Sequence, residues 1–101
     1  MAAKLRKTQD EEHVLDRRRG IKLRVEAWVD SSGRVARFNL AYINPVAFAG
    51  DNGRVLGYDN AHGEVHRHYL GAISALGEMT YEQSSDAFTR EFQRLWKDWS
   101  S

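Results

Sequence analysis

The sequence has 101 residues, of which 42% are hydrophobic and 29% charged, with a formal net charge of +1 and no cysteine. This length suits one folded domain, and the composition excludes a disordered chain. The lack of cysteine excludes disulfides, thiolate zinc sites and a cysteine nucleophile, and the small net charge excludes nucleic-acid binding by bulk attraction alone.

The N-terminal third begins with signals that are typical of a helix. Residues 1–7 are expected to form a short, flexible basic arm of a single domain that spans residues 1–101. The Thr-Gln-Asp-Glu sequence at 8–11 has the form of a capping box, and three arginines precede Gly20, which suits the position after a helix end. These signals predict a surface helix over residues 9–19.

The middle of the chain reads as antiparallel strands joined by turns. Apolar residues alternate with polar ones over 21–30, and a Ser-Ser-Gly turn leads to a return strand over 34–43 that is apolar on both sides. Asn52-Gly53 is a type I′ turn signal, so a third strand is expected over 54–59 and a short one over 65–70. Residues 71–79 have no firm period and are expected to be a connection.

The C-terminal segment predicts an amphipathic helix that begins after Thr80. Its apolar stripe is formed by Phe88, Phe92, Leu95 and Trp99, which recur at helical spacing. The predicted fold is therefore α+β: a small antiparallel β-meander of three to four strands with an N-terminal and a C-terminal helix packed on it.

Three histidines, His62, His66 and His68, lie within seven residues. On a strand, His66 and His68 share one face with about 7 Å between their Cα atoms, and Arg67 faces the other way unless a bulge turns it. Two imidazoles beside a cation suit RNA cleavage, in which one activates the 2′-hydroxyl and the other protonates the leaving oxygen. A solvent-edge hydrogen-bonded cluster, or a metal site completed by His62 or Asp59, are the alternatives.

Two further features have a functional and a structural interpretation. Arg90, Arg94 and Lys97 lie opposite the apolar stripe of the C-terminal helix, either as a solvated face or as a track for nucleic-acid phosphates. Trp28 and Trp96 lie off the predicted core faces, where they suit base stacking or a protein partner unless other segments cover them.

One segment resembles the toxin component of the TumE-like toxin–antitoxin family. The resemblance is best over residues 22–70 and depends on the run Tyr58-Asp59-Asn60-Ala61-His62-Gly63, followed by His66-Arg67-His68. It implies a ribonuclease-like growth inhibitor paired with a small DNA-binding antitoxin. It also implies that the functional residues are Tyr58, Asp59, Asn60, His66, Arg67 and His68, with His62 and Gly63 extending the set.

The sequence thus predicts a toxin-like, metal-independent RNA-cleaving domain without a cofactor. His66, His68 and His62 are its candidate acid–base residues and Arg67 its phosphate clamp; Tyr58, Asp59, Asn60 and the helix cations would contact the substrate. RNA and a cognate antitoxin are the expected partners, and a homodimer is left open. With no signal peptide and no apolar run long enough for a membrane span, we expect a cytoplasmic location. The alternatives are a non-enzymatic protein-interaction module that uses its tryptophans and N-terminal helix, and a small His-ligated metal-binding protein.

Overall fold

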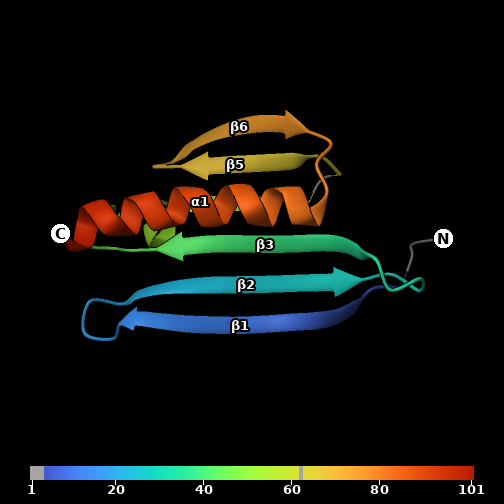
Figure 1. Ribbon diagram of the computed structural model, residues 1–101, viewed down its shortest axis with the longest axis horizontal. Helices are drawn as coiled ribbons and strands as arrows, with labels where there is room; N and C mark the ends of the chain where they lie inside the picture. Colours follow the sequence, from blue (N-terminus) through green and yellow to red (C-terminus); the bar gives the residue numbers. More distant parts are fainter. Residues whose placement is uncertain (1–3, 62) are drawn as a thin grey trace.

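The computed structural model describes residues 4–61 and 63–101, which form one antiparallel sheet and one long helix. The elements are β1 (Arg6–Asp16), β2 (Ile21–Val29), β3 (Val35–Ile43), the single-turn 3-10 helix η1 (Asp51–Gly53), β4 (Arg54–Asp59), β5 (Val65–Tyr69), β6 (Ala72–Gly77) and α1 (Tyr81–Ser100). The six strands lie side by side in chain order. Figure 1 labels β1, β2, β3, β5 and β6 in this order, with α1 in front of the sheet between β3 and β5. The predicted strands over 54–59 and 65–70 are confirmed almost to the residue.

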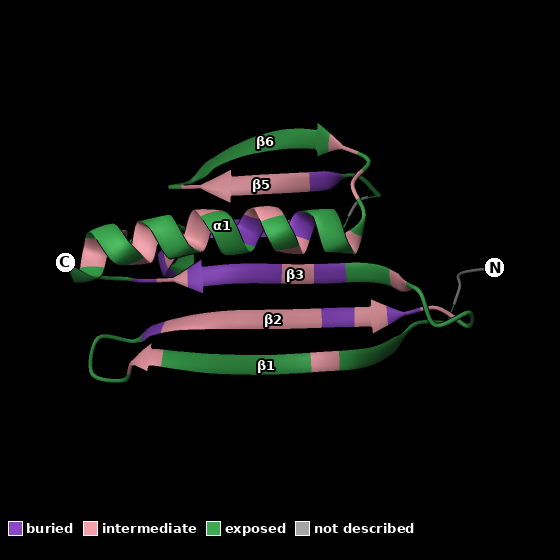
Figure 2. Ribbon diagram, in the orientation of Figure 1, coloured by how far each residue is buried: buried purple, intermediate pink, exposed green. Residues whose placement is uncertain are grey.

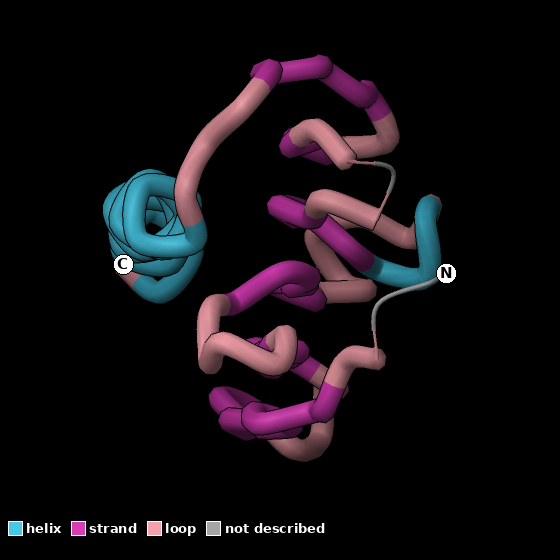
Figure 3. The backbone as a smooth tube through the Cα atoms, turned by 90° about the vertical axis from the view of Figure 1, so that its right-hand side faces the viewer, coloured by secondary structure: helices cyan, strands magenta, loops and turns pink. Residues whose placement is uncertain are grey.

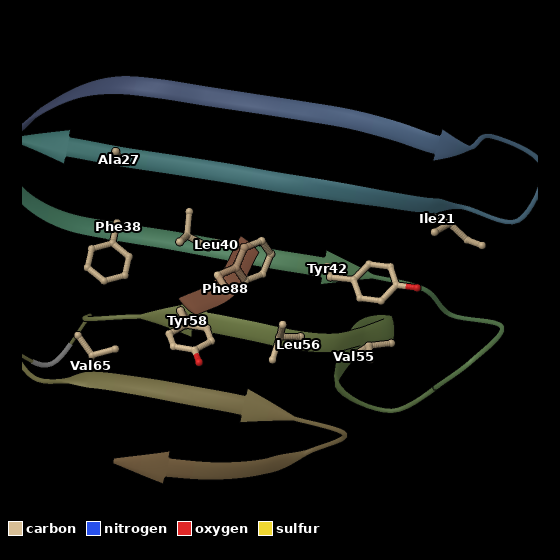
Figure 4. Packing of buried hydrophobic residues seen from close by; sticks show 10 residues of the cluster. All are labelled: Ile21, Ala27, Phe38, Leu40, Tyr42, Val55, Leu56, Tyr58, Val65 and Phe88. Carbon is tan, nitrogen blue, oxygen red and sulfur yellow. The ribbon is translucent and has the colours of Figure 1, made fainter. Parts of the chain in front are cut away.

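The core lies between α1 and the centre of the sheet. Phe38, Leu40 and Tyr42 of β3, together with Leu56 and Tyr58 of β4, are buried there (Figure 4). Because side chains alternate along a strand, these residues all point to the face that α1 covers.

The C-terminal helix is confirmed, including its cap. The Thr80 side chain accepts a hydrogen bond from the Gln83 amide, and Gln83 accepts one from the Thr80 amide. Phe88 is buried, and Phe92 packs its ring edge-to-face on Tyr42 with the ring centres 5.1 Å apart. Trp96, predicted to lie off the core, also packs against Tyr42.

The predicted N-terminal helix is wrong, because this segment is the edge strand β1. It pairs with β2 along its whole length, and Arg6 and Lys7 begin the strand instead of belonging to a flexible arm. Cross-strand ion pairs hold the register: Lys7 to Glu26 at 2.8 Å, Lys22 to Glu12 at 2.7 Å and Arg24 to Asp10 at 3.0 Å. Residues 17–20, expected to be the end of the helix, form the hairpin turn, and the φ of +69° at Gly20 fits that turn.

The predicted count of three to four strands is also wrong, because residues 72–77 form β6 and β1 replaces the helix. A two-residue turn, Leu70-Gly71, joins β5 to β6, and both residues have positive φ, +50° and +84°. The fold is therefore a six-stranded meander with one C-terminal helix, and the described residues contain no N-terminal helix.

The second face of the sheet carries no long helix in the described part of the chain (Figure 3). We call it the open face. Register partners place one polar row across five strands of it: Asp10, Glu26, Asn39, Asp59 and His66. None of the helices in the described residues combines the length and the apolar character that crossing a membrane requires.

Candidate functional site

A cavity of about 660 Å³ hollows the open face above the central strands. Its lining includes Trp28 of β2, Arg37 and Asn39 of β3, Asp59 of β4, and His66 and His68 of β5. This volume lies within the range of small-molecule sites in proteins. The period of two along β5 places both histidines on one face of the sheet, as the sequence predicted, and both line this cavity.

His68 is held at both ring nitrogens. Its Nε2 lies 2.8 Å from Asp59 Oδ2, and its Nδ1 lies 3.1 Å from Nη2 of Arg54. Since a guanidinium can only donate, Nδ1 must accept, and the proton on Nε2 is then donated to Asp59. The geometry thus selects one tautomer of His68, with Asp59 as the group that orients the ring.

Arg54 reaches His68 because residue 57 is glycine. Gly57 is the register partner of His68 on β4, and a Cβ built on it would lie 2.7 Å from Cδ of Arg54. The Arg54 side chain therefore crosses the space that any larger side chain would fill. Its Nε also donates to Asp51 of η1 at 2.8 Å, which fixes the guanidinium between a carboxylate and the imidazole.

His66 has a freer ring than His68. Its Nε2 lies 3.6 Å from Glu64 Oε1, which allows attraction between charges but is too long for a hydrogen bond. Its side chain is 23% exposed, and its register partner is Asp59. His66 can therefore exchange a proton with a ligand in the cavity without first breaking a hydrogen bond to the described residues.

Trp28 lies at the β2–β3 end of the cavity between two cations. Lys7 Nζ and the Arg37 guanidinium carbon are each 5.0 Å from its ring centre. Lys7 also pairs with Glu26, and this hydrogen bond is the main reason that the pKa of Glu26 is lowered. Arg37 forms no ion pair with the described residues, so its charge remains available to an anionic ligand.

Arg67, predicted as the phosphate clamp, lies on the face that α1 covers. Its Nε is 3.1 Å from both carboxylate oxygens of Glu91, and its Nη2 bonds the same group. The hydrogen bond to Glu91 raises the pKa of Arg67. Arg67 thus anchors α1 to the sheet and is separated from the histidine cavity by the sheet itself.

Tyr58 belongs to the same anchor. It is only 3% exposed, and its hydroxyl donates to Glu91. Burial, followed by this bond, raises its pKa to about 12. Tyr58 was predicted to bind substrate, but its side chain is enclosed in the core beneath α1.

Asn60 and the helix cations also lie outside the cavity. The Asn60 carboxamide accepts from the Phe38 amide and donates to the Ala36 carbonyl, so it extends the β3–β4 pairing past the end of β4. Arg90, Arg94 and Lys97 are exposed residues of α1, and α1 lies on the opposite side of the sheet from the open face. His62 lies outside the described residues.

A metal site receives no support from the described residues. No group of three or more His, Cys, Asp or Glu side chains gathers there as a ligand set. Asp59 and His68 are adjacent, but the second nitrogen of His68 is occupied by Arg54.

Comparison with known proteins adds no relative. No family model, curated protein or solved structure matches this chain. The resemblance to TumE-like toxins therefore stays a prediction.

The site also includes residues that the sequence did not single out: Arg37 and Asn39 line the cavity, and Arg54 supports His68 from outside its lining. Arg54 is invisible as a site residue until β4 and β5 are paired, because fourteen positions separate it from His68. Arg37 and Asn39 could have been found from the period of two along the 34–43 strand, which places them opposite the apolar set of Phe38 and Leu40.

Proposed function

We propose that this protein binds RNA on its open face and cleaves it by histidine acid–base chemistry. The single observation that carries the proposal is the cavity that Arg37, Asp59, His66 and His68 line from three strands. Arg54 lies outside the cavity lining and reaches this group through its hydrogen bond to His68. Cleavage of a phosphodiester requires groups that accept and donate protons and cations that stabilise the negative charge of the transition state.

Asp59 and His68 supply the first proton transfer. Asp59 holds the Nε2 proton and thereby leaves Nδ1 as the basic nitrogen, the same orienting role that a carboxylate plays for a catalytic histidine. In the free protein Arg54 covers Nδ1. A substrate phosphate would compete for the guanidinium, and its arrival would uncover the base where the 2′-hydroxyl lies.

His66 supplies the second transfer. The 2′-oxygen, deprotonated by His68, attacks phosphorus while the bond to the 5′-oxygen breaks, and protonated His66 gives its proton to that oxygen. The products are a 2′,3′-cyclic phosphate and a 5′-hydroxyl. Arg54 and Arg37 stabilise the charge on the phosphorane, in the role that the sequence had assigned to Arg67.

The test is cleavage of single-stranded RNA with analysis of the product ends. His66→Gln and His68→Gln should each reduce the rate by about 10²–10⁴-fold, since a positioned acid or base contributes that much. A DNA strand of the same sequence should not be cut, because it lacks the attacking hydroxyl, and a chelator should change nothing.

His13→Gln is the matched control, because this histidine is exposed on β1, far from the cavity. Cleavage that survives in both histidine variants would overturn the catalytic roles. Binding of RNA without cleavage would reduce the protein to a non-enzymatic module, the second function that the sequence left open.

The proposal extends to the partner and the compartment that the TumE-like resemblance implies. As a toxin, the protein would act on cellular RNA in the cytoplasm and would be held inactive by a cognate antitoxin. Expression in a bacterial host tests this: growth should stop with the parent sequence and continue with His66→Gln. Growth that continues with both the parent sequence and His66→Gln would contradict the toxin role. The cleavage assay in vitro would still test the catalytic roles of the histidines.

A further inference from the structure

The strand β6 is an exposed edge without charge. It is the last strand of the sheet, so one side of its backbone has no strand beside it. All its residues except Gly77 are exposed, and Ile73 is 65% exposed (Figure 2). Unpaired N–H and C=O groups on an apolar edge favour pairing with another strand.

The other edge of the sheet is protected against such pairing. β1 carries charged side chains on both faces, including Asp10, Glu11 and Glu12. If two copies of β1 paired about Glu11, that residue would face its own copy and Asp10 would face Glu12, and like charges directly opposite are destabilising. Among the described strands, β6 alone has no charged or titratable side chain.

The sequence of β6 fits a copy of itself in one register. In an antiparallel pair about a two-fold axis at Ser74, Ile73 faces Ala75 of the second copy and Ala72 faces Leu76. Gly71 and Gly77 face each other at the two ends. In the regular middle of the pair the large Ile73 thus meets the small Ala75, and the two Ser74 hydroxyls meet on the axis, where cross-strand serines can hydrogen-bond. A bulge near Leu76 limits the regular pairing to the middle of the strand.

We propose that two copies of this chain associate through β6 about a two-fold axis at Ser74, which joins their sheets into one. The self-complementary register favours a second copy over an unrelated peptide, because only self-pairing requires an edge free of like charges. Ile73 lines the cavity of the open face, so the axis would also place the cavities of the two copies on one continuous surface.

A cysteine at the axis gives a sharp test, since the chain has no cysteine of its own. Directly opposed residues of an antiparallel pair have Cα atoms about 4.5–5.5 Å apart, which a disulfide can bridge. Ser74→Cys should therefore form a cross-linked dimer under mild oxidation. The matched control is Ala72→Cys, exposed on the same strand, whose copies would lie about 14 Å apart and should not cross-link.

Sedimentation of the parent protein completes the test. It should show a species of twice the 11.6-kDa chain mass, and Ser74→Lys, which places two like charges on the axis, should shift it to the mass of one chain. Circular dichroism checks that this edge variant stays folded. A parent that sediments as one chain at every concentration, or Ala72→Cys that cross-links as well as Ser74→Cys, would overturn the proposal.

Discussion

At the scale of single residues, the side chain of Arg54 crosses Gly57 to reach Nδ1 of His68. We predict that Gly57→Ala moves the guanidinium away, because a Cβ would lie 2.7 Å from its Cδ atom. The nitrogen chemical shifts of the His68 ring should then show that Nε2 is still protonated, because Asp59 keeps that proton, while the Nδ1 resonance moves because this atom loses its hydrogen bond from Arg54. An unchanged Nδ1 resonance in the variant would mean that Arg54 does not bond to His68.

A second residue-scale prediction concerns the β5–β6 turn. Leu70 has a φ of +50°, a conformation that costs a residue with a Cβ roughly 1–2 kcal/mol but that asparagine tolerates. Leu70 is 45% exposed, so little apolar burial is lost by replacing it. Leu70→Asn should therefore raise the free energy of unfolding by about 1 kcal/mol in a denaturant titration. A decrease would show that the leucine side chain contributes more than its backbone costs.

The period of two explains which site residues could be predicted. It correctly placed His66 and His68 on one face, and it already indicated that Arg67 would face away from them. The short motif Tyr58-Asp59-Asn60 carries no such information on its own, and only Asp59 of the three reaches the cavity. Tyr58 and Arg67 instead meet Glu91, a partner on α1 that no local pattern could reveal.

At the scale of elements, α1 is tied to the sheet by the Glu91 carboxylate as well as by its aromatic stripe. Burial works against the charged form of Glu91, but the hydrogen bonds from Arg67 and Tyr58 outweigh it and lower its pKa. A lowered pKa in the folded state means that the carboxylate stabilises the fold above its unfolded value of 4.5, and that this contribution is lost as the pH falls through the folded value.

Glu91→Gln should therefore destabilise the protein at neutral pH by about 1.5–3 kcal/mol, the range for hydrogen bonds to charged groups. The difference in the free energy of unfolding between parent and variant should shrink as the pH is lowered from about 5 to 3, because Glu91 of the parent protein then becomes protonated and loses its charge. Thermal unfolding across this range measures both effects, with Asp86→Asn on the exposed side of α1 as the control. A difference in the free energy of unfolding that is the same at every pH would mean that the charge of the Glu91 carboxylate does not stabilise the packing of α1 on the sheet.

The two errors in the element prediction have physical causes. Polar residues lie on both faces of β1 because it is an edge strand. The sequence therefore shows no alternation of polar and apolar residues there, and the capping-box signal led to the prediction of a helix. What decides its structure is pairing with β2 and the ion pairs between them, which are long-range. β6 was missed because its turn is made by Leu70-Gly71, and leucine is not a residue that signals positive φ.

At the scale of the whole molecule, the sheet separates two surfaces with different composition. One face is covered by α1, whose outer side presents Arg90, Arg94 and Lys97; the other is the open face with the histidine cavity. The length predicted a single domain, but no pattern in the sequence indicated that one helix leaves a whole sheet face uncovered. That division gives two candidate surfaces for the proposed RNA binding, on opposite sides of the molecule (Figure 3).

The most direct test of the account is to map where RNA binds. A single-stranded RNA that carries 2′-O-methyl groups cannot be cleaved by attack of its 2′-oxygen, so it can be titrated into isotope-labelled protein. We predict that the NMR resonances of the Trp28 indole, the His66 and His68 rings and the Arg37 backbone amide shift together during the titration. The resonances of Arg90, Arg94 and Lys97 should not shift. Shifts confined to the outer side of α1, or no shifts on the open face at saturation, would contradict the account.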